Sequence, residues 1–151
     1  KSYRLLFFVV VPFFATIIVA LPLVSWLWIG RSDAQFILFG SILAAGWGLN
    51  TLTGPAYFIN LGTGDLRWNS IAHVVMAILN VLLGLLLAPL LGGLGVAISA
   101  MIALSIGSGF IMYALHNQYK IPYLVIIPEE HYLLLLIIFL SVPTIGWISR
   151  Y

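Results

Sequence analysis

Cysteine is absent from this 151-residue chain, and charged side chains are scarce: six Lys and Arg and four Asp and Glu, or 7% of the residues. Without cysteine there is no disulfide framework, thiolate metal site or cysteine nucleophile. A soluble domain has roughly a quarter of its residues charged, so the scarcity of charge excludes a water-soluble globule. The net charge of +2 is too small to favour nucleic-acid binding.

Apolar residues are abundant instead: 63% of the residues are hydrophobic, and the mean hydropathy is +1.17. A hydrocarbon core about 30 Å thick requires about 20 apolar residues of helix. Five segments meet this requirement within a few residues at each end: 5–29, 34–61, 69–88, 93–116 and 130–148. We therefore predict an all-α integral membrane protein, a bundle of about five transmembrane helices.

The spans divide the chain into two parts. Residues 1–120 are predicted to hold four transmembrane helices, and residues 121–151 an interfacial connector and one additional helix. The first apolar run is about 25 residues long and lacks a small-residue cleavage site, so it is interpreted as a spanning helix and not a signal peptide. Because the chain begins with Lys1, we expect it to be a piece of a longer protein.

Basic residues predict the orientation of the spans. If the chain alternates sides, four basic residues fall on one face of the membrane and two on the other. The four are Lys1, Arg4, Arg67 and Lys120, and the two are Arg31 and Arg150. By the positive-inside rule the first face is cytoplasmic, which places the N-terminus of this segment in the cytoplasm.

Proline interrupts two of the predicted helices, at Pro12 and Pro22 in the first and at Gly54-Pro55 in the second. Proline removes a backbone hydrogen bond, and a spanning helix tolerates it where neighbouring helices, hydroxyl groups or water satisfy the freed carbonyl. Two interpretations stay open: these sites are packing kinks, or they are bends used in opening and closing a cavity.

Small residues recur at four-residue spacing in the segment 93–116. One row consists of Gly95, Ser99, Ala103 and Gly107, and the row beside it begins with Gly93 and Ala97. Such rows let helix backbones approach closely in a membrane. We therefore expect this helix to pack against neighbours on two sides.

The turn at residues 62–67 resembles a phosphate-binding loop only superficially. Gly62 and Gly64 lie two residues apart, but Arg67 stands where the dinucleotide fingerprint requires a third glycine, and no strand precedes the turn. A turn in which Asp65 or Asn69 caps the next helix is favoured.

Metal binding and catalysis are not expected either. Glu129, Glu130 and His131 lack the spacing that places two histidines on one helical face. No Asp, Glu, Lys or Arg lies deep in any span, whereas an enzyme needs an acid/base or metal constellation. No cofactor and no metal are predicted.

Uncharged polar residues within the spans are the candidate functional residues. They are Asn50, Thr53, Tyr57 and Asn60 in the second predicted helix, and His73 and Asn80 in the third, where Asn69 precedes them on the same stripe. Polar groups in a membrane usually face a bundle interior or a water-filled cavity, so the two stripes could line one substrate path. The alternative is that they hydrogen-bond to neighbouring helices, and His73 could be structural or relay protons.

The order of elements adds a family resemblance. A helix with Pro12 ends at Trp28-Ile29-Gly30, and a long helix and the turn at 62–67 follow. A helix with a central Asn80 then leads into Pro89-Leu-Leu-Gly-Gly-Leu-Gly-Val-Ala-Ile-Ser. Over residues 4–120 this resembles the C-terminal half of polysaccharide-biosynthesis proteins, the O-antigen-type flippases of the multidrug/oligosaccharidyl-lipid/polysaccharide exporter superfamily.

The motif from Asn80 to Ala97 carries this resemblance best. In that family an Asn in the helix tends to be followed by a Pro or polar turn and by Gly-x-x-Gly-Ala-Ala, with Val96 of this chain standing where the family favours Ala. Related flippases hold the substrate diphosphate with arginines in the cavity. This chain has no buried cationic residue, so no substrate residue is carried over.

The resemblance implies two lobes of six helices around a cavity that opens to each side in turn. This chain would hold the last four helices of the second lobe and one additional helix, and the N-terminal lobe would be missing. The implied function is translocation of a lipid-linked oligosaccharide, such as a precursor of lipopolysaccharide O-antigen, across the bacterial plasma (inner) membrane. Its partners would be membrane lipids, the lipid-linked glycan and the missing lobe.

Two alternatives stay open. One is a multidrug and toxic compound extrusion-type antiporter of the same superfamily, which acidic residues in the missing lobe would favour. The other is of a different class, a non-catalytic structural membrane subunit or part of a membrane-embedded enzyme.

Overall fold

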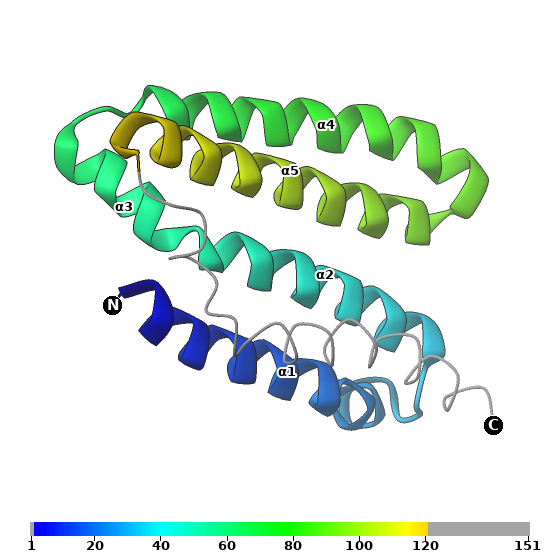
Figure 1. Cartoon of the computed structure of the whole chain (residues 1–151). Coiled ribbons are helices and arrows are strands. Elements are labelled where there is room, and N and C mark those ends of the chain that lie inside the picture. Colours follow the sequence, from blue (N-terminus) through cyan, green and yellow to red (C-terminus); the bar gives the residue numbers. More distant parts are fainter. Residues whose placement is uncertain (1, 121–151) are drawn as a thin grey trace.

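The computed structural model describes residues 2–120, and this part of the chain consists of helices joined by short turns, without a β-strand (Figure 1). Its five helices are α1 (Ser2–Ile29), α2 (Ala34–Leu52), α3 (Gly54–Thr63), α4 (Arg67–Leu91) and α5 (Gly93–Tyr119). Four of them, α1, α2, α4 and α5, are long and apolar enough to cross a membrane. The prediction of an all-α, multi-pass membrane protein is confirmed. The predicted connector and fifth span in 121–151 lie outside the described residues.

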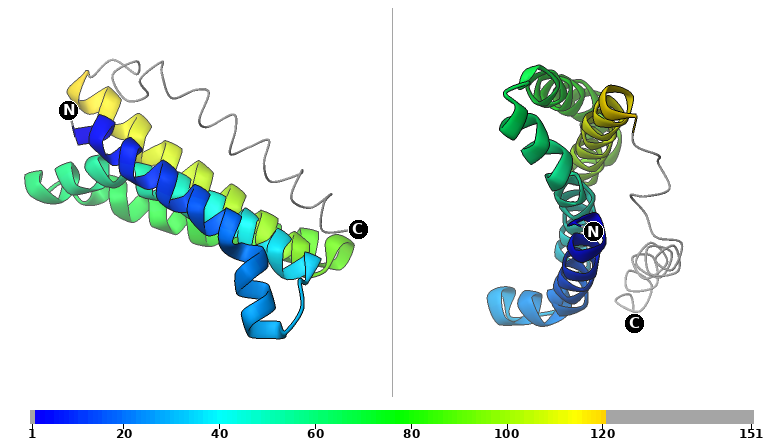
Figure 2. Two further views of the ribbon diagram at one scale, coloured as in Figure 1. Left: turned by 90° about the horizontal axis from the view of Figure 1, so that it is seen from below. Right: turned by 60° about the vertical axis from the view of Figure 1, so that its left-hand side comes forward.

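The long helices form a curved row in the order α4, α5, α2, α1. α5 packs against α4 on one side and α2 on the other, and α1 packs against α2. Seen nearly along the helices, the row is C-shaped, and α3 lies on its concave side against α4, α5 and α2 (Figure 2, right). The row therefore has two broad faces, and α4 and α1 form its edges.

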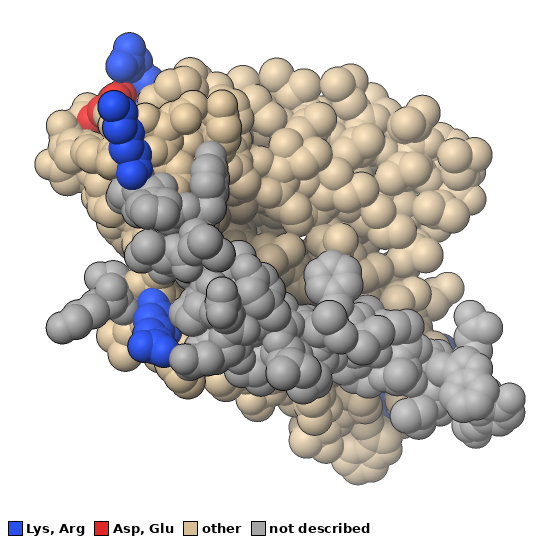
Figure 3. Space-filling model, in the orientation of Figure 1, with Lys and Arg blue, Asp and Glu red and all other residues tan. Residues whose placement is uncertain are grey.

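Large apolar side chains are exposed on the two edge helices. Leu85 of α4 is 72% exposed, and Leu5 of α1 is 71% exposed. Lys and Arg side chains lie instead at the ends of the row (Figure 3): Arg4, Arg67 and Lys120 where α1 and α4 begin and α5 ends, and Arg31 in the turn between α1 and α2 at the other end. This division is typical of helices whose sides contact lipid and whose ends reach the membrane surface.

A buried serine holds the turn between α1 and α2. The Ser25 hydroxyl donates to the Arg31 carbonyl at 2.9 Å and accepts from the Asp33 backbone N–H at 2.9 Å. Asp33 in turn caps α2 by accepting from the Phe36 N–H. α1 bends sharply in its last third (Figure 2, left), the part of the helix that follows Pro22, which cannot donate a backbone hydrogen bond.

The second predicted helix, 34–61, is in fact two helices. Thr53 interrupts it: its backbone N–H donates to Asn50 O in a tight turn, and its ψ is −3°. Pro55 then lies in the first turn of α3, the position in a helix where the missing N–H costs least. The predicted kink at Gly54-Pro55 is therefore a break between α2 and α3.

The predicted cap of α4 is wrong. α3 ends at Gly64, which has a positive φ of 76°, a conformation that glycine adopts without strain. α4 begins after Leu66, and neither Asp65 nor Asn69 supplies a capping bond. Both side chains have other partners, described below.

α5 approaches both of its neighbours closely at glycines. A Cβ atom on Gly95 would collide with the Leu87 carbonyl of α4, and one on Gly46 of α2 would lie 3.2 Å from the Met101 Cα of α5. Such contacts between backbones replace the hydrophobic drive that helices lack in a bilayer.

The six small residues singled out in α5 divide by position. Gly95, Ala97, Ser99, Ala103 and Gly107 are buried, whereas Gly93 is exposed at the start of the helix.

Candidate functional site

The asparagines at positions 50 and 80 bind α5 from its two sides. Ser108 of α5 donates to Asn50 Oδ1 of α2 at 3.0 Å, and Ser99 of α5 lies 3.4 Å from Asn80 Oδ1 of α4. The two serines are nine residues apart, which places them on opposite sides of a helix with 3.6 residues per turn. Asn50 thus links α2 to α5, as expected of polar side chains that join membrane helices. Asn80 contacts α5 more weakly, because the single Ser99 proton is shared with the Val96 carbonyl at 2.7 Å.

A second polar cluster joins α3 to α4. Asn60 Nδ2 donates to Asn69 Oδ1 at 2.8 Å, and Asn69 Nδ2 donates to the Tyr57 carbonyl at 3.1 Å. Asn60 is completely buried and Asn69 is 5% exposed. Asn60 Oδ1 has no hydrogen-bond partner among residues 2–120, so this buried amide is only partly satisfied.

His73 lies at the edge of that cluster. Its Nδ1 atom is 2.7 Å from the Asn69 carbonyl, and its ring meets the Tyr57 ring edge to face with centroids 5.9 Å apart. Because the carbonyl can only accept, this contact fixes Nδ1 as the protonated nitrogen when the ring is neutral. The side chain is exposed, and Nε2 is then left as an acceptor directed away from the carbonyl.

Asn80 is exposed near the midpoint of α4. It follows Asn69 by eleven residues, which is about three turns of helix, so the two side chains point to the same side of α4. Asn69 contacts α3, which lies on the concave side of the row. Asn80 therefore faces the concave side beyond α3, and its Nδ2 group has no partner in the described part of the chain.

The structure therefore groups the six candidates in three places. Tyr57, Asn60 and His73 gather around Asn69. Asn50 and Thr53 lie at the end of α2, where the Thr53 hydroxyl donates to the Asn50 carbonyl at 2.6 Å. Asn80 stands apart. Thr53 and Asn60 are buried, and the role of the six residues as a substrate path stays a prediction.

Sequence reasoning did not identify the partners of these residues. Ser99 entered it only as a small packing residue, and Ser108 was not singled out. The signal that could have revealed both is the presence of two serines on opposite sides of a helix already expected to have two neighbours.

A charged cluster lies at the end of the row, in the turn between α3 and α4. Arg67 Nε donates to Asp65 Oδ1 at 3.1 Å, and Gln118 of α5 donates to Asp65 Oδ2 at 3.2 Å. The hydrogen bond from Arg67 holds the pKa of the Asp65 carboxyl below its usual value of 3.8, and the bond from Gln118 lowers this pKa further. Asp65 is thus charged at neutral pH and ties the turn to the last residues of α5.

The chemistry available within the spans is hydrogen bonding by neutral groups. Among residues 2–120, no group of three or more His, Asp and Glu side chains could hold a metal ion. The amides and the imidazole can donate to and accept from hydroxyl groups or water. No protein-family model, curated protein or solved structure matches the chain.

Proposed function

We propose that this chain forms part of the second lobe of a two-lobe flippase that translocates a lipid-linked oligosaccharide across the bacterial plasma membrane. In this proposal the N-terminus is cytoplasmic and the concave side of the row faces the other lobe. The protein makes and breaks no covalent bonds. Translocation depends on different affinities for the substrate in the inward-open and outward-open states.

The position of Asn80 carries this proposal. Lipid tails offer no hydrogen-bond partner to a primary amide, so a polar side chain near the middle of a span faces protein or a water-filled cavity. Asn80 is exposed on the concave side, and Leu85 and Leu82 supply an apolar surface elsewhere on α4. This asymmetry supports a cavity on the concave side.

The polar groups on that side suit a glycan. Sugar hydroxyls both donate and accept, and asparagine amides and a neutral histidine do the same. Groups without a hydrogen-bond partner among residues 2–120, such as the Asn80 Nδ2 atom and His73 Nε2, are available for such bonds without the desolvation of a buried charge. A diphosphate, in contrast, requires cations, which this proposal assigns to the missing lobe.

The break between α2 and α3 supports a moving part. Transporters commonly build their binding sites from discontinuous helices, whose freed backbone groups lie at a cavity. Here α3 is short and lies on the concave side. In this proposal α3 changes its angle at Thr53, the single residue between it and α2, when its bonds to Asn69 of α4 are released.

The proposal is tested with the full-length protein in vesicles that contain a fluorescent lipid-linked oligosaccharide. Translocation is followed by the fraction of label that an external quencher reaches. We expect Asn80→Leu to slow translocation and Leu85→Ala, on the exposed apolar surface of the same helix, to leave it unchanged. Equal rates for Asn80→Leu and the unmodified protein, or a full-length sequence without a first lobe of spanning helices, would contradict it.

A further inference from the structure

The last third of α1 departs from the direction of the spanning helices. α1 is 28 residues long, which corresponds to about 42 Å of helix, more than the roughly 30 Å of a hydrocarbon core. Pro22 cannot donate to the Ile18 carbonyl four residues before it, and the residues that follow extend away from the row at its α1 edge (Figure 2, left). We call residues 22–29 the bent segment of α1.

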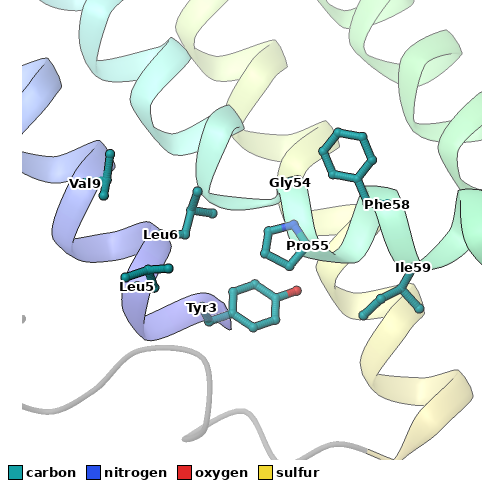
Figure 4. Close-up of a pocket in the computed structure, with 8 residues that line it drawn as sticks. All are labelled: Tyr3, Leu5, Leu6, Val9, Gly54, Pro55, Phe58 and Ile59. Atoms are coloured by element: carbon teal, nitrogen blue, oxygen red, sulfur yellow. The ribbon is translucent and has the colours of Figure 1, made fainter. Parts of the chain in front are cut away.

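The part of α1 before Pro22 is long enough to cross the membrane by itself. Residues 2–21 extend over about 30 Å as a helix, which is the thickness of the hydrocarbon core. This part starts beside α3, where the Tyr3 ring is directed towards α3 (Figure 4) and its hydroxyl lies near the Ala56 backbone. α2, with 19 residues, extends over about 28 Å. Because the bent segment and the turn after it join the far ends of these two spans, they lie at the level of the opposite membrane surface.

A charged turn marks that surface. Arg31 and Asp33 follow the bent segment, with Arg31 Nη2 3.5 Å from Asp33 Oδ2 and the Arg31 side chain 76% exposed. Charged groups are costly within the hydrocarbon core, so this turn lies outside the core. The buried Ser25 hydroxyl binds both the Arg31 carbonyl and the Asp33 N–H, and these two bonds hold the bent segment next to the turn.

The exposed side chains of the bent segment are apolar, and two of them are tryptophans. Trp28 is 86% exposed, more than any other large apolar side chain among residues 2–120, and Trp26 and Leu27 are 59% and 69% exposed. Exposed apolar surface of this kind marks contact with lipid or with other protein. Tryptophan is enriched at membrane–water interfaces, where its ring contacts apolar chains and its N–H reaches polar groups. The composition and the level of the bent segment therefore favour the lipid interface.

We propose that the bent segment lies in the plane of the membrane, at the boundary between headgroups and acyl chains of the leaflet that is farther from the start of α1. Trp26 and Trp28 anchor it there. The partner of this surface is the bilayer itself, which thereby sets the depth of α1 and α2, the two spans that meet at the turn. The inference does not depend on the proposed transport function.

Spin labels test the orientation of the bent segment. Each label is attached to a single cysteine in the full-length protein, with any other cysteines replaced, in vesicles of phosphatidylethanolamine and phosphatidylglycerol. The depth of a label follows from its accessibility to oxygen, which partitions into the hydrocarbon core, and to a water-soluble nickel chelate. Two exposed pairs, Leu23 with Leu27 and Val24 with Trp28, each lie four residues apart and so on one side of the helix. We expect the two labels of each pair to have the same depth.

Val81 and Leu85, an exposed pair with the same spacing on α4, are the control. Their labels should differ in depth by up to about 6 Å, the rise of four residues along a spanning helix. A difference of that size within both pairs of the bent segment overturns the proposal. Labels that only the chelate reaches, which lie in water, also overturn it, and so do labels that neither reagent reaches, which are covered by protein.

Quenching by brominated lipids tests the depth of Trp28 itself, kept as the only tryptophan of the full-length protein. Bromine near the carbonyl end of the acyl chains should quench its fluorescence more strongly than bromine near the chain ends. A tryptophan introduced instead by Leu82→Trp, at an exposed position near the middle of α4, is the control and should show the opposite order. Trp28 with the same order as this control, or without quenching by either lipid, would contradict the proposal.

Discussion

Asn69→Ala is the substitution whose effect on stability follows most directly from the structure. The Asn69 amide makes two of the bonds that join α3 to α4, one with Asn60 and one with the Tyr57 carbonyl. Hydrogen bonds between membrane helices contribute about 0.6 kcal/mol on average and about 1.7 at most. The two together are worth about 1–3 kcal/mol.

A further cost falls on Asn60. It is fully buried, and its Oδ1 atom already lacks a partner in residues 2–120. Loss of Asn69 leaves its Nδ2 group unpaired as well, at about 1–3 kcal/mol for a buried unsatisfied group. We therefore expect Asn69→Ala to lower the free energy of unfolding by about 2–5 kcal/mol in total.

Replacing both partners should cost less than the sum of the single changes. In Asn60→Leu/Asn69→Leu no amide is left unpaired in this pair, and only the Tyr57 carbonyl loses a donor. The double-mutant cycle should give a coupling energy of about 1–3 kcal/mol. Ser105→Ala, which removes a bond within α5 to the Met101 carbonyl, is the matched control and should change stability by about 0.5 kcal/mol or less.

Reversible unfolding in mixed micelles with increasing dodecyl sulfate measures these effects. Trp68 is a local reporter, because it lies next to Asn69 and its ring is 5.6 Å from that of Phe110 on α5; the other tryptophans are replaced. Additive effects of the two asparagine substitutions, or an Asn69→Ala variant as stable as the Ser105→Ala control, would refute the reasoning.

Two other predictions concern the packing of α5 and the charged turn. Gly95→Ala should destabilise the protein by about 1–3 kcal/mol, because α4 and α5 must separate to admit the Cβ atom. Gly109→Ala in the same helix is the control and should not destabilise it, because the space around its Cβ position is open. Equal unfolding midpoints for the two variants would contradict this. The lowered pKa of Asp65 means that its bonds stabilise the turn at neutral pH and are lost as the pH falls through and below 3.8. Protection from hydrogen exchange at the end of α5, taken relative to the intrinsic exchange rate at each pH, should therefore fall over that range. In Asp65→Asn this protection should already be low at neutral pH and should not change over the range; a loss of protection with pH that persists in this variant would count against the assignment.

The positions of the spans could be predicted from the sequence because a bilayer fixes the length of apolar helix that crosses it. The observed ends differ from the predicted ones by at most three residues, apart from the break at Thr53. That break was expected only as a kink, because Pro55 constrains its own backbone and that of Gly54. It does not determine which acceptor the N–H of Thr53, two residues before it, binds. In the structure this N–H donates to Asn50 O.

The neighbours of each helix could not be predicted in the same way. Hydropathy does not show which helices are neighbours in the folded protein. The polar stripes on two consecutive predicted helices, the second and the third, therefore suggested that these two helices share one cavity. In the structure α5 lies between α2 and α4. Ser108 of α5 donates to Asn50 on one side, and Ser99 contacts Asn80 on the other. Polar residues that look alike in sequence therefore differ: Asn50 and Asn60 join helices, while the Asn80 Nδ2 group has no partner among residues 2–120.

Water access to position 80 tests the central claim, a polar cavity on the concave side of the row. The described chain has no cysteine, so a single cysteine can be placed at Asn80, or at Leu85 as the control, in the full-length protein with any other cysteines replaced. A water-soluble, membrane-impermeant thiol reagent is then applied to intact vesicles. We predict that Asn80→Cys is modified and that Leu85→Cys, whose native side chain is 72% exposed on the apolar surface, is not. An Asn80→Cys variant as unreactive as the control would contradict the account.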